Sequence, residues 1–294
     1  MNWEFEKVAG PYKGRTGGLA WDGKAMLFSA VQEERIMRFD PASGKAEVFR
    51  KYTGRTNGLA IAADGSVFGA QEGGRRVVHF LNDGSTAPTE ELLDGKHHNQ
   101  PVDVIVDGKG RVLFADPYNG TPPFGPPVYQ FLDHASVLCL ERDGKTWKTK
   151  RVTHDTHGPR ALALSADGKT LYVADGDIER GDVCQLFSYP VKPDGSVGSG
   201  KAMVTFMVNE RGIEGMCLDS DGNILACAGW KKGGGGPVIH VISPAGMILE
   251  THPVPADMPM RCAFGDAGLT SLYLTAGDGG LYRATNTGRR GVRR

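Results

Sequence analysis

The chain has 294 residues, and its 34 basic side chains balance 34 acidic ones, so the formal net charge is zero. This balance provides no overall field to attract nucleic acid or an anionic membrane, which argues against a general nucleic-acid-binding protein. Glycine (42 residues) and proline (17 residues) are frequent and are poor in helix interiors, so a helical bundle is disfavoured. A hydrophobic content of 40% indicates a folded core rather than a disordered chain.

The sequence carries no recognisable targeting or membrane signal. Its N-terminal stretch lacks the basic head and apolar run of a secretory signal, and no segment approaches the run of about 18 apolar residues that a membrane span needs. The five cysteines are odd in number and show no CxxC spacing. We therefore expect a cytoplasmic protein with reduced thiols, no membrane partner and one domain covering residues 1–294.

A short apolar block recurs along the whole chain. Arg15–Ala20 (RTGGLA) returns as Arg55–Ala60 (RTNGLA), and each copy is followed by a turn signal and a second apolar run. Five of the copies turn at Asp-Gly, which suits tight hairpins because both residues tolerate a positive φ. The six copies start near positions 17, 57, 102, 160, 214 and 261, at intervals of 40 to 58 residues. This period is typical of propeller blades, and the sequence predicts an all-β, six-bladed β-propeller.

The last repeat is shorter than the others, so it needs a strand from elsewhere. The alternating residues Trp3–Phe5 precede the first repeat and are the available candidate. We predict that they form the outer strand of the last blade beside Gly280–Arg283, and that deleting residues 1–8 lowers the melting temperature.

The first residue of each repeat should face the mouth of the central channel, because the innermost strand of a propeller blade lines that channel. Six positions therefore converge there: Gly17, Asn57, Val102, Arg160, Glu214 and Arg261. The neighbouring Thr16, Asn99 and Asp103 add further polar groups. Two arginines and a glutamate on one axis suit a small anionic or hydroxyl-rich ligand, since guanidinium groups match carboxylates. The other interpretation is a buried ion-pair network that only stabilises the fold.

Five sequence blocks spread over nearly the whole chain carry a family pattern. They are Asn57–Ala60, Gln100–Asp103 with Val106–Asp107, Gly168–Asp175, Glu214–Asp219 and Cys262–Gly265. Together they resemble the family of gluconolactonase, regucalcin (senescence marker protein) and luciferin-regenerating enzyme. The resemblance implies a six-bladed propeller that hydrolyses lactones. It also implies one divalent ion at the channel mouth, commonly calcium, with zinc, manganese or iron in some members.

The metal ligands that the resemblance implies are only partly present. The family's first-blade glutamate falls on Gly17, and the asparagine of its Pro-Asn-Asp motif falls on Val102, although the aspartate that follows is retained as Asp103. The asparagine of its Asn-Gly-Leu motif falls on Arg160, and the aspartate of its Asp-Gly-Met motif falls on Glu214. Only Glu214 keeps a donor oxygen, whereas a hard cation takes about six oxygen ligands and is repelled by an arginine. We therefore expect the usual metal site to be absent or rebuilt.

A rebuilt site is one hypothesis. His97–Asn99 precede the third blade and His154–His157 precede the fourth, so both loops should reach the same mouth. His154 and His157 with Glu214 would suit zinc or iron better than calcium. The alternative is that these are ordinary solvated loop histidines.

A second hypothesis replaces the metal ion by arginine. Arg160 and Arg261 would polarise a carbonyl and hold a developing oxyanion, and Asp103, His157 or Glu214 would act as general base on water. We predict a hydrolase that opens a lactone or related ester. We assign catalysis to Asp103, Arg160 and His157. We assign substrate binding to Asn57, Asn99, Arg261 and Thr16. If an ion is bound, Glu214 is its ligand.

Two other functions fit the same residues. A non-catalytic propeller would bind a ligand or a protein partner at the mouth, which the loss of three family ligands favours. An isomerase or lyase would use Arg160 and Arg261 to grip a carboxylate. In each case the proline-rich segment 120–127 either covers the site as an apolar lid or is a plain connection.

Overall fold

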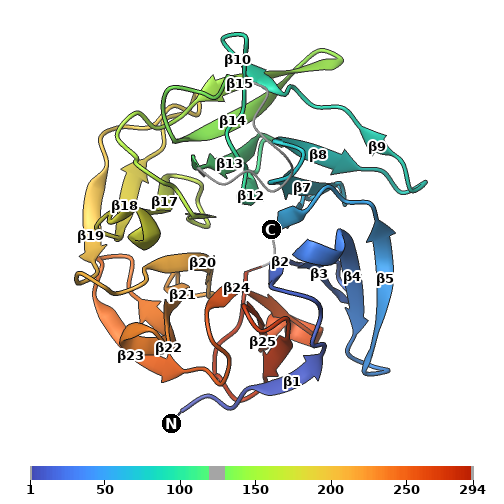
Figure 1. Ribbon diagram of the computed structural model, residues 1–294, viewed down its shortest axis with the longest axis vertical. Helices are drawn as coiled ribbons and strands as arrows, with labels where there is room; N and C mark the ends of the chain where they lie inside the picture. The colour runs from blue at the N-terminus through green and yellow to red at the C-terminus, as the bar shows by residue number, and fades with distance from the viewer. Residues whose placement is uncertain (1, 119–129, 293–294) are drawn as a thin grey trace.

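Six four-stranded antiparallel sheets surround a central channel in a computed structural model that describes residues 2–118 and 130–292 (Figure 1). The predicted six-bladed β-propeller is confirmed. The predicted lid segment, 120–127, lies outside the described residues. No helix in the described part of the chain is both long enough and apolar enough to cross a membrane.

Each blade runs outward from the axis in chain order. Blade 1 consists of β2 (Thr16–Trp21), β3 (Met26–Ala30), β4 (Arg35–Asp40) and β5 (Lys45–Lys51); blade 2 of β6 (Thr56–Ile61), β7 (Val67–Gln71), β8 (Arg76–Phe80) and β9 (Thr86–Ala87); and blade 3 of β12 (Asp103–Val106), β13 (Val112–Asp116), β14 (Ser136–Asp143) and β15 (Thr146–Arg151). Blade 4 consists of β16 (Ala161–Leu164), β17 (Thr170–Asp175), β18 (Gln185–Pro190) and β19 (Lys201–Thr205); and blade 5 of β20 (Ile213–Leu218), β21 (Ile224–Trp230), β22 (Gly233–Ile242) and β23 (Ile248–Pro253). The innermost strands begin within two residues of the predicted repeat starts.

Blade 6 is closed by the N-terminus. It consists of β24 (Pro259–Gly265), β25 (Ser271–Ala276), β26 (Leu281–Ala284) and β1 (Glu6–Ala9), with Glu6 opposite Arg283. The predicted closure is confirmed, but its placement on Trp3–Phe5 is wrong. Trp3 is instead buried between blades 5 and 6, where its ring stacks on that of His252 at 3.9 Å between centroids.

Smaller elements connect the blades. They are the two-stranded sheet of β10 (Leu92–Leu93) and β11 (Lys96–His97) and the short 3-10 helices η1 (Val31–Glu33), η2 (Ile178–Arg180) and η3 (Ala267–Leu269). The apolar core consists of side chains packed between adjacent sheets, for example Leu225 of blade 5 against Leu274 of blade 6. No disulfide joins any of the five cysteines, all of which lie within the described residues.

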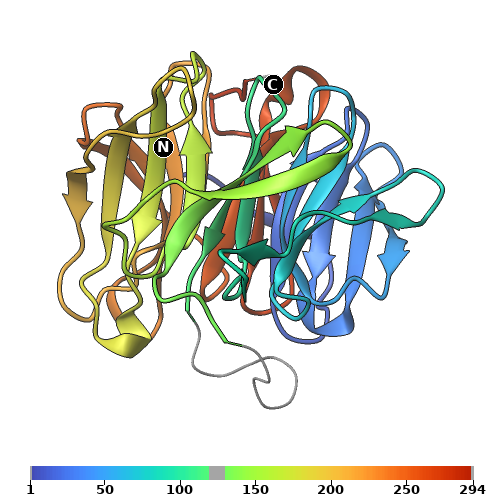
Figure 2. The same ribbon diagram turned by 90° about the horizontal axis from the view of Figure 1, so that it is seen from above.

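The channel has two different ends, because all six inner strands run in the same direction through the ring (Figures 1 and 2). We call the end where these strands begin the mouth, and the end where they turn back into the second strand the turn end. At the turn end, Gly291 of the C-terminal segment forms a bridge to Asp219 just after β20. Side chains at the strand starts therefore meet at the mouth, whereas those at the strand ends meet at the turn end.

Candidate functional site

Charged side chains from four blades meet around the mouth. Glu214, the second residue of β20, is buried, and its Oε1 lies 2.7 Å from Nη2 of Arg211. Burial alone would raise the pKa of Glu214, but the guanidinium groups of Arg211, Arg160, Arg261 and Arg15 outweigh it and lower the pKa to about 2. Glu214 is therefore a permanent anion held among arginines.

Arg160 stands next to this carboxylate, at the start of β16. Its main-chain N–H donates to Ala174 O at 2.8 Å, which fixes the backbone in the blade. Its guanidinium forms an ion pair with Asp177 in the loop after β17, and Glu214 and Asp177 are its two strongest electrostatic partners. The structure thus brings Arg160 and Glu214 together at the mouth, as their places in the repeat predicted.

A carboxylate that the sequence interpretation missed completes the other side of the mouth. Glu72, directly after β7, is buried and pairs with Arg15 and with Arg55 Nη2 at 2.9 Å. Its Oε2 also accepts from Asn57 Nδ2 at 3.3 Å. Glu72 follows a second strand rather than opening a repeat, so it was not sought at the mouth. The sequence did contain a signal, because Arg15 and Arg55 occupy equivalent positions in adjacent repeats, and two neighbouring half-buried arginines favour an anion between them.

We call these side chains together the mouth cluster: Arg15, Arg55, Asn57, Glu72, Arg160, Asp177, Arg211 and Glu214. Four guanidinium groups face three buried or half-buried carboxylates. One further acid, the exposed Glu179, lies 3.9 Å from Arg211, where solvent screens it. In the mouth cluster, four half-buried guanidinium groups therefore surround the buried carboxylates of Glu72 and Glu214.

An ion pair crosses the channel beneath the mouth cluster. Arg261 of blade 6 reaches Asp103 of the opposite blade 3, with Nε 3.3 Å from Oδ1. Asp103 Oδ2 accepts from Leu162 N at 2.8 Å, and Arg261 Nη2 donates to the carbonyls of Val102 and Arg160 at 3.0 and 3.4 Å. Burial raises the pKa of Asp103, and the single guanidinium of Arg261 only partly offsets it.

The remaining predicted site residues have different surroundings. The His157 side chain is 79% exposed at the rim of the mouth, and its Nδ1 lies 3.6 Å from Asp175 Oδ2. Asn57 is buried, and its Oδ1 has no hydrogen-bond partner among the described residues. Both side chains can therefore still meet a ligand.

Thr16 and Asn99 are bonded within the protein. Thr16 Oγ1 donates to Gly280 O at 2.7 Å and accepts from Ala276 N at 3.1 Å, so it joins blade 1 to blade 6. Asn99 Nδ2 lies 3.2 Å from two main-chain carbonyls, and its Oδ1 accepts from Leu132 N at 3.1 Å. Their assignment to substrate binding stays a prediction.

The mouth does not fit the family's divalent ion. Gly17, Val102 and Arg160 offer no side-chain oxygen, and Glu214 faces Arg211. In residues 2–118 and 130–292, no three side chains of His, Cys, Asp or Glu are close enough to share an ion. This result argues against the rebuilt zinc or iron site on His154, His157 and Glu214.

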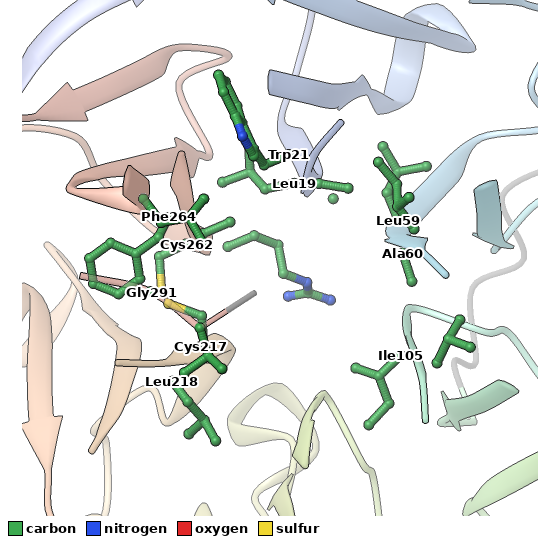
Figure 3. Close-up of a pocket in the computed structure, with 18 of the residues that line it drawn as sticks. Leu19, Trp21, Leu59, Ala60, Ile105, Cys217, Leu218, Cys262, Phe264 and Gly291 are labelled. Atoms are coloured by element: carbon green, nitrogen blue, oxygen red, sulfur yellow. Dashed lines mark hydrogen bonds between the residues drawn. The ribbon is translucent and has the colours of Figure 1, made fainter. Parts of the chain in front are cut away.

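The turn end contains a cavity of about 660 Å³ in which most of the lining side chains are apolar (Figure 3). Leu19, Leu59, Ile105, Leu218, Cys262 and Phe264 are among its lining residues. Of the polar side chains near the mouth, only Asp103 and Arg261 reach it, at its inner end. The cross-channel pair thus separates an ionic mouth from an apolar cavity.

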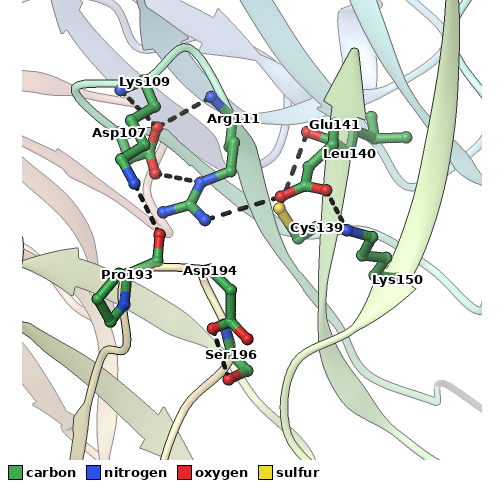
Figure 4. A network of polar contacts seen from close by, with 10 residues as sticks. All are labelled: Asp107, Lys109, Arg111, Cys139, Leu140, Glu141, Lys150, Pro193, Asp194 and Ser196. Carbon is green, nitrogen blue, oxygen red and sulfur yellow. Dashed lines mark hydrogen bonds and ion pairs between the residues drawn. The ribbon is translucent and has the colours of Figure 1, made fainter. Parts of the chain in front are cut away.

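A second ion network lies away from the mouth, where blades 3 and 4 meet (Figure 4). Arg111 Nε lies 2.6 Å from Asp107 Oδ2, and Lys109 Nζ donates to the Pro193 carbonyl at 2.7 Å. The Arg111 side chain is about as buried as that of Arg160 and is likewise paired with an aspartate. Arg111 is therefore a natural control for Arg160.

Comparisons with known proteins find relatives that cover most of the chain. The profile of the family described as SMP-30/Gluconolactonase/LRE-like region matches residues 16–278. Regucalcin of Xenopus laevis is 24% identical, covering 92% of this chain and 91% of its own length. The 6-deoxy-6-sulfogluconolactonase of Pseudomonas putida is 25% identical, covering 84% of this chain and 80% of its own. The solved structure of a gluconolactonase from Xanthomonas campestris has the same fold, with a TM-score of 0.79 and 22% identity over 96% of this chain and 89% of that one.

Proposed function

Because the chain belongs to the SMP-30/gluconolactonase/LRE-like family, we propose that it is an enzyme that hydrolyses a lactone, or a related ester, of a small anionic substrate at the mouth cluster. The observation that carries the proposal is the group of guanidiniums around Glu214, at the mouth where the family resemblance implies a divalent ion. A buried guanidinium can hold the negative charge that develops on the carbonyl oxygen of the substrate, as a metal ion would.

The mouth cluster has donors to spare for an anionic group. The Nε atoms of Arg15, Arg160 and Arg211 are buried and have no hydrogen-bond partner among the described residues. A buried donor normally has a partner, whether protein, water or ligand, because each costs roughly 1–3 kcal/mol when unsatisfied. A substrate that bears a sulfonate, carboxylate or phosphate would satisfy them. The relative named 6-deoxy-6-sulfogluconolactonase supports this direction, because the compound in its name carries a sulfonate.

The side chains of the mouth can perform lactone opening in two steps. His157, whose main-chain N–H donates to the Asp175 carboxylate, takes a proton from water at Nε2 while the oxygen attacks the lactone carbonyl carbon. Arg160 holds the resulting oxyanion. The ring C–O bond then breaks, and His157 returns the proton to the leaving alkoxide, which gives a hydroxy acid. Arg261 binds the main-chain carbonyl of Arg160, and Asp103 acts through Arg261.

The proposal is tested by lactone hydrolysis followed with a pH indicator, on matched neutral and anionic sugar lactones, with and without EDTA. We expect turnover that resists EDTA and is faster with the anionic lactones. Arg160→Ala should lower kcat by about 100-fold, the loss typical of one oxyanion donor. Arg111→Ala, the control at the junction of blades 3 and 4, should leave kcat within twofold.

A second pair of variants tests the base. His157→Asn should lower kcat by about 100-fold, whereas His154→Asn, in the same exposed loop, should not. Turnover abolished by EDTA, or Arg160→Ala within twofold of wild type, would contradict the arginine mechanism. If every lactone is inert but anionic sugars raise the melting temperature, the binding propeller or the isomerase or lyase takes its place.

A further inference from the structure

Two cysteines face each other in the wall of the turn-end cavity. Cys217 lies in β20 and Cys262 in β24, the innermost strands of blades 5 and 6, and their Sγ atoms are 3.6 Å apart. Figure 3 shows both side chains at the cavity, with their sulfur atoms adjacent. Cys217 is half-buried, whereas Cys262 is buried behind it. A small oxidant that enters the cavity can therefore reach this pair.

The backbones of the two strands are close enough for a bond between the sulfurs. A Cβ added to Gly215, two residues before Cys217, would lie 2.8 Å from the Cα of Arg261 and 2.2 Å from the carbonyl oxygen of Met260. Only glycine permits this approach of β20 to β24. Disulfides need Cα atoms within about 7 Å and an S–S distance of about 2 Å, so the sulfurs have to move by roughly 1.5 Å. Rotation of the half-buried Cys217 side chain can supply that movement.

We propose that Cys217 and Cys262 are a modification site for peroxide, which oxidises them to a disulfide that joins blades 5 and 6. The proposal does not depend on the reaction at the mouth. In the first step Cys217, the more accessible of the two, passes its proton to the hydrogen-bonded Cys262 sulfur and attacks one oxygen of hydrogen peroxide. The O–O bond breaks, Cys217 becomes a sulfenic acid, and the leaving hydroxide takes the proton from Cys262 as water. In the second step the Cys262 thiolate attacks the Cys217 sulfur and displaces a second hydroxide. Two thiols and one peroxide give one disulfide and two waters.

The surroundings of the thiols favour this pair over the other cysteines. Hydrogen bonds from the Cys217 and Cys227 thiols lower the pKa of Cys262, against the effect of burial. Burial raises the pKa of Cys139 to about 12, and it also raises the pKa of Cys184. Burial likewise raises the pKa of Cys227, which keeps it a thiol donor to Cys262.

The test titrates the full-length protein with hydrogen peroxide, counts its thiols and maps its disulfides by mass spectrometry without reduction. We expect the count to fall from five to three, with a Cys217–Cys262 link that dithiothreitol reverses. The oxidised protein should melt a few degrees higher than the reduced one, because the link closes a long loop. Cys217→Ser should abolish both changes, whereas Cys139→Ser should keep them.

The order of attack is tested with dimedone, which traps sulfenic acids. In Cys262→Ser we expect peroxide to leave Cys217 labelled, because its resolving partner is absent. If that variant does not fold, the wild-type disulfide map decides alone. Five thiols that persist under excess peroxide, or a link that involves Cys139, Cys184 or Cys227 instead, would overturn the proposal.

Discussion

The two ends of the channel are built by the same six strands but have opposite chemistry. The mouth cluster is a set of half-buried guanidiniums paired with carboxylates, whereas the turn end is a cavity of about 660 Å³ lined mainly by apolar side chains, with two thiols in its wall. Although the net charge of the chain is zero, four half-buried guanidinium groups gather at the mouth. In this propeller, electrostatics and not volume identifies the site that suits a polar substrate.

Two carboxylates near the axis sharpen the comparison. Glu214 faces several guanidiniums and its pKa is lowered to about 2, whereas burial raises the pKa of Asp103 despite its pairing with Arg261. Both acids are buried, so burial does not account for the difference. The number of nearby positive charges decides the sign.

The largest expected effect comes from breaking the pair that separates the two ends. Arg261→Ala leaves Asp103 buried without its cation, which should lower the free energy of unfolding by about 3–5 kcal/mol. The double variant Asp103→Leu/Arg261→Met removes both charges, so it should recover most of the free energy of unfolding that Arg261→Ala loses. Urea denaturation at pH 7 measures both, with Arg38→Ala, in the exposed Arg38–Asp22 pair, as a control expected to cost less than about 1 kcal/mol. A single variant as stable as wild type would show that the pair does not hold the channel together.

The next effect concerns the mouth alone and depends on pH. The pKa of Glu214 falls from 4.5 to about 2 on folding, so its ionisation stabilises the protein by roughly 3 kcal/mol above pH 4.5, and this contribution is lost as the pH falls toward 2. Glu214→Gln removes it. We therefore expect the stability difference between wild type and Glu214→Gln to shrink steadily from pH 5 to pH 2.5 in urea denaturation.

The control for that profile is Glu47→Gln, which removes an exposed glutamate of β5 on the outside of blade 1. It should be as stable as wild type at each pH. A difference between wild type and Glu214→Gln that stays constant over the same range would show that Glu214 is not held among cations in the folded protein.

The sequence predicted the blades well because propeller repeats are local. The recurring RTxGLA block and the Asp-Gly turns specify each inner hairpin within a few residues. It also predicted that Arg160 and Glu214 meet, since equivalent repeat positions converge on the axis. Glu72 was missed because its contact with Arg15 joins the end of one strand to the start of another blade. The Cys217–Cys262 contact was missed for a similar reason, since the alignment of residues in one blade with those in the next cannot be predicted from a single repeat.

The smallest expected effect is a difference between the two channel ends in how their reactions respond to salt. If the mouth cluster binds an anionic lactone, raising NaCl from 50 to 500 mM should increase its KM about threefold, because added ions screen the attraction over a shorter Debye length. The KM of the matched neutral lactone should change little. Oxidation of Cys217 by neutral peroxide at the apolar end should proceed at the same rate in both salts. An equal rise in KM for both lactones would indicate a general effect of salt on the protein, and would place the anion preference somewhere other than at the mouth.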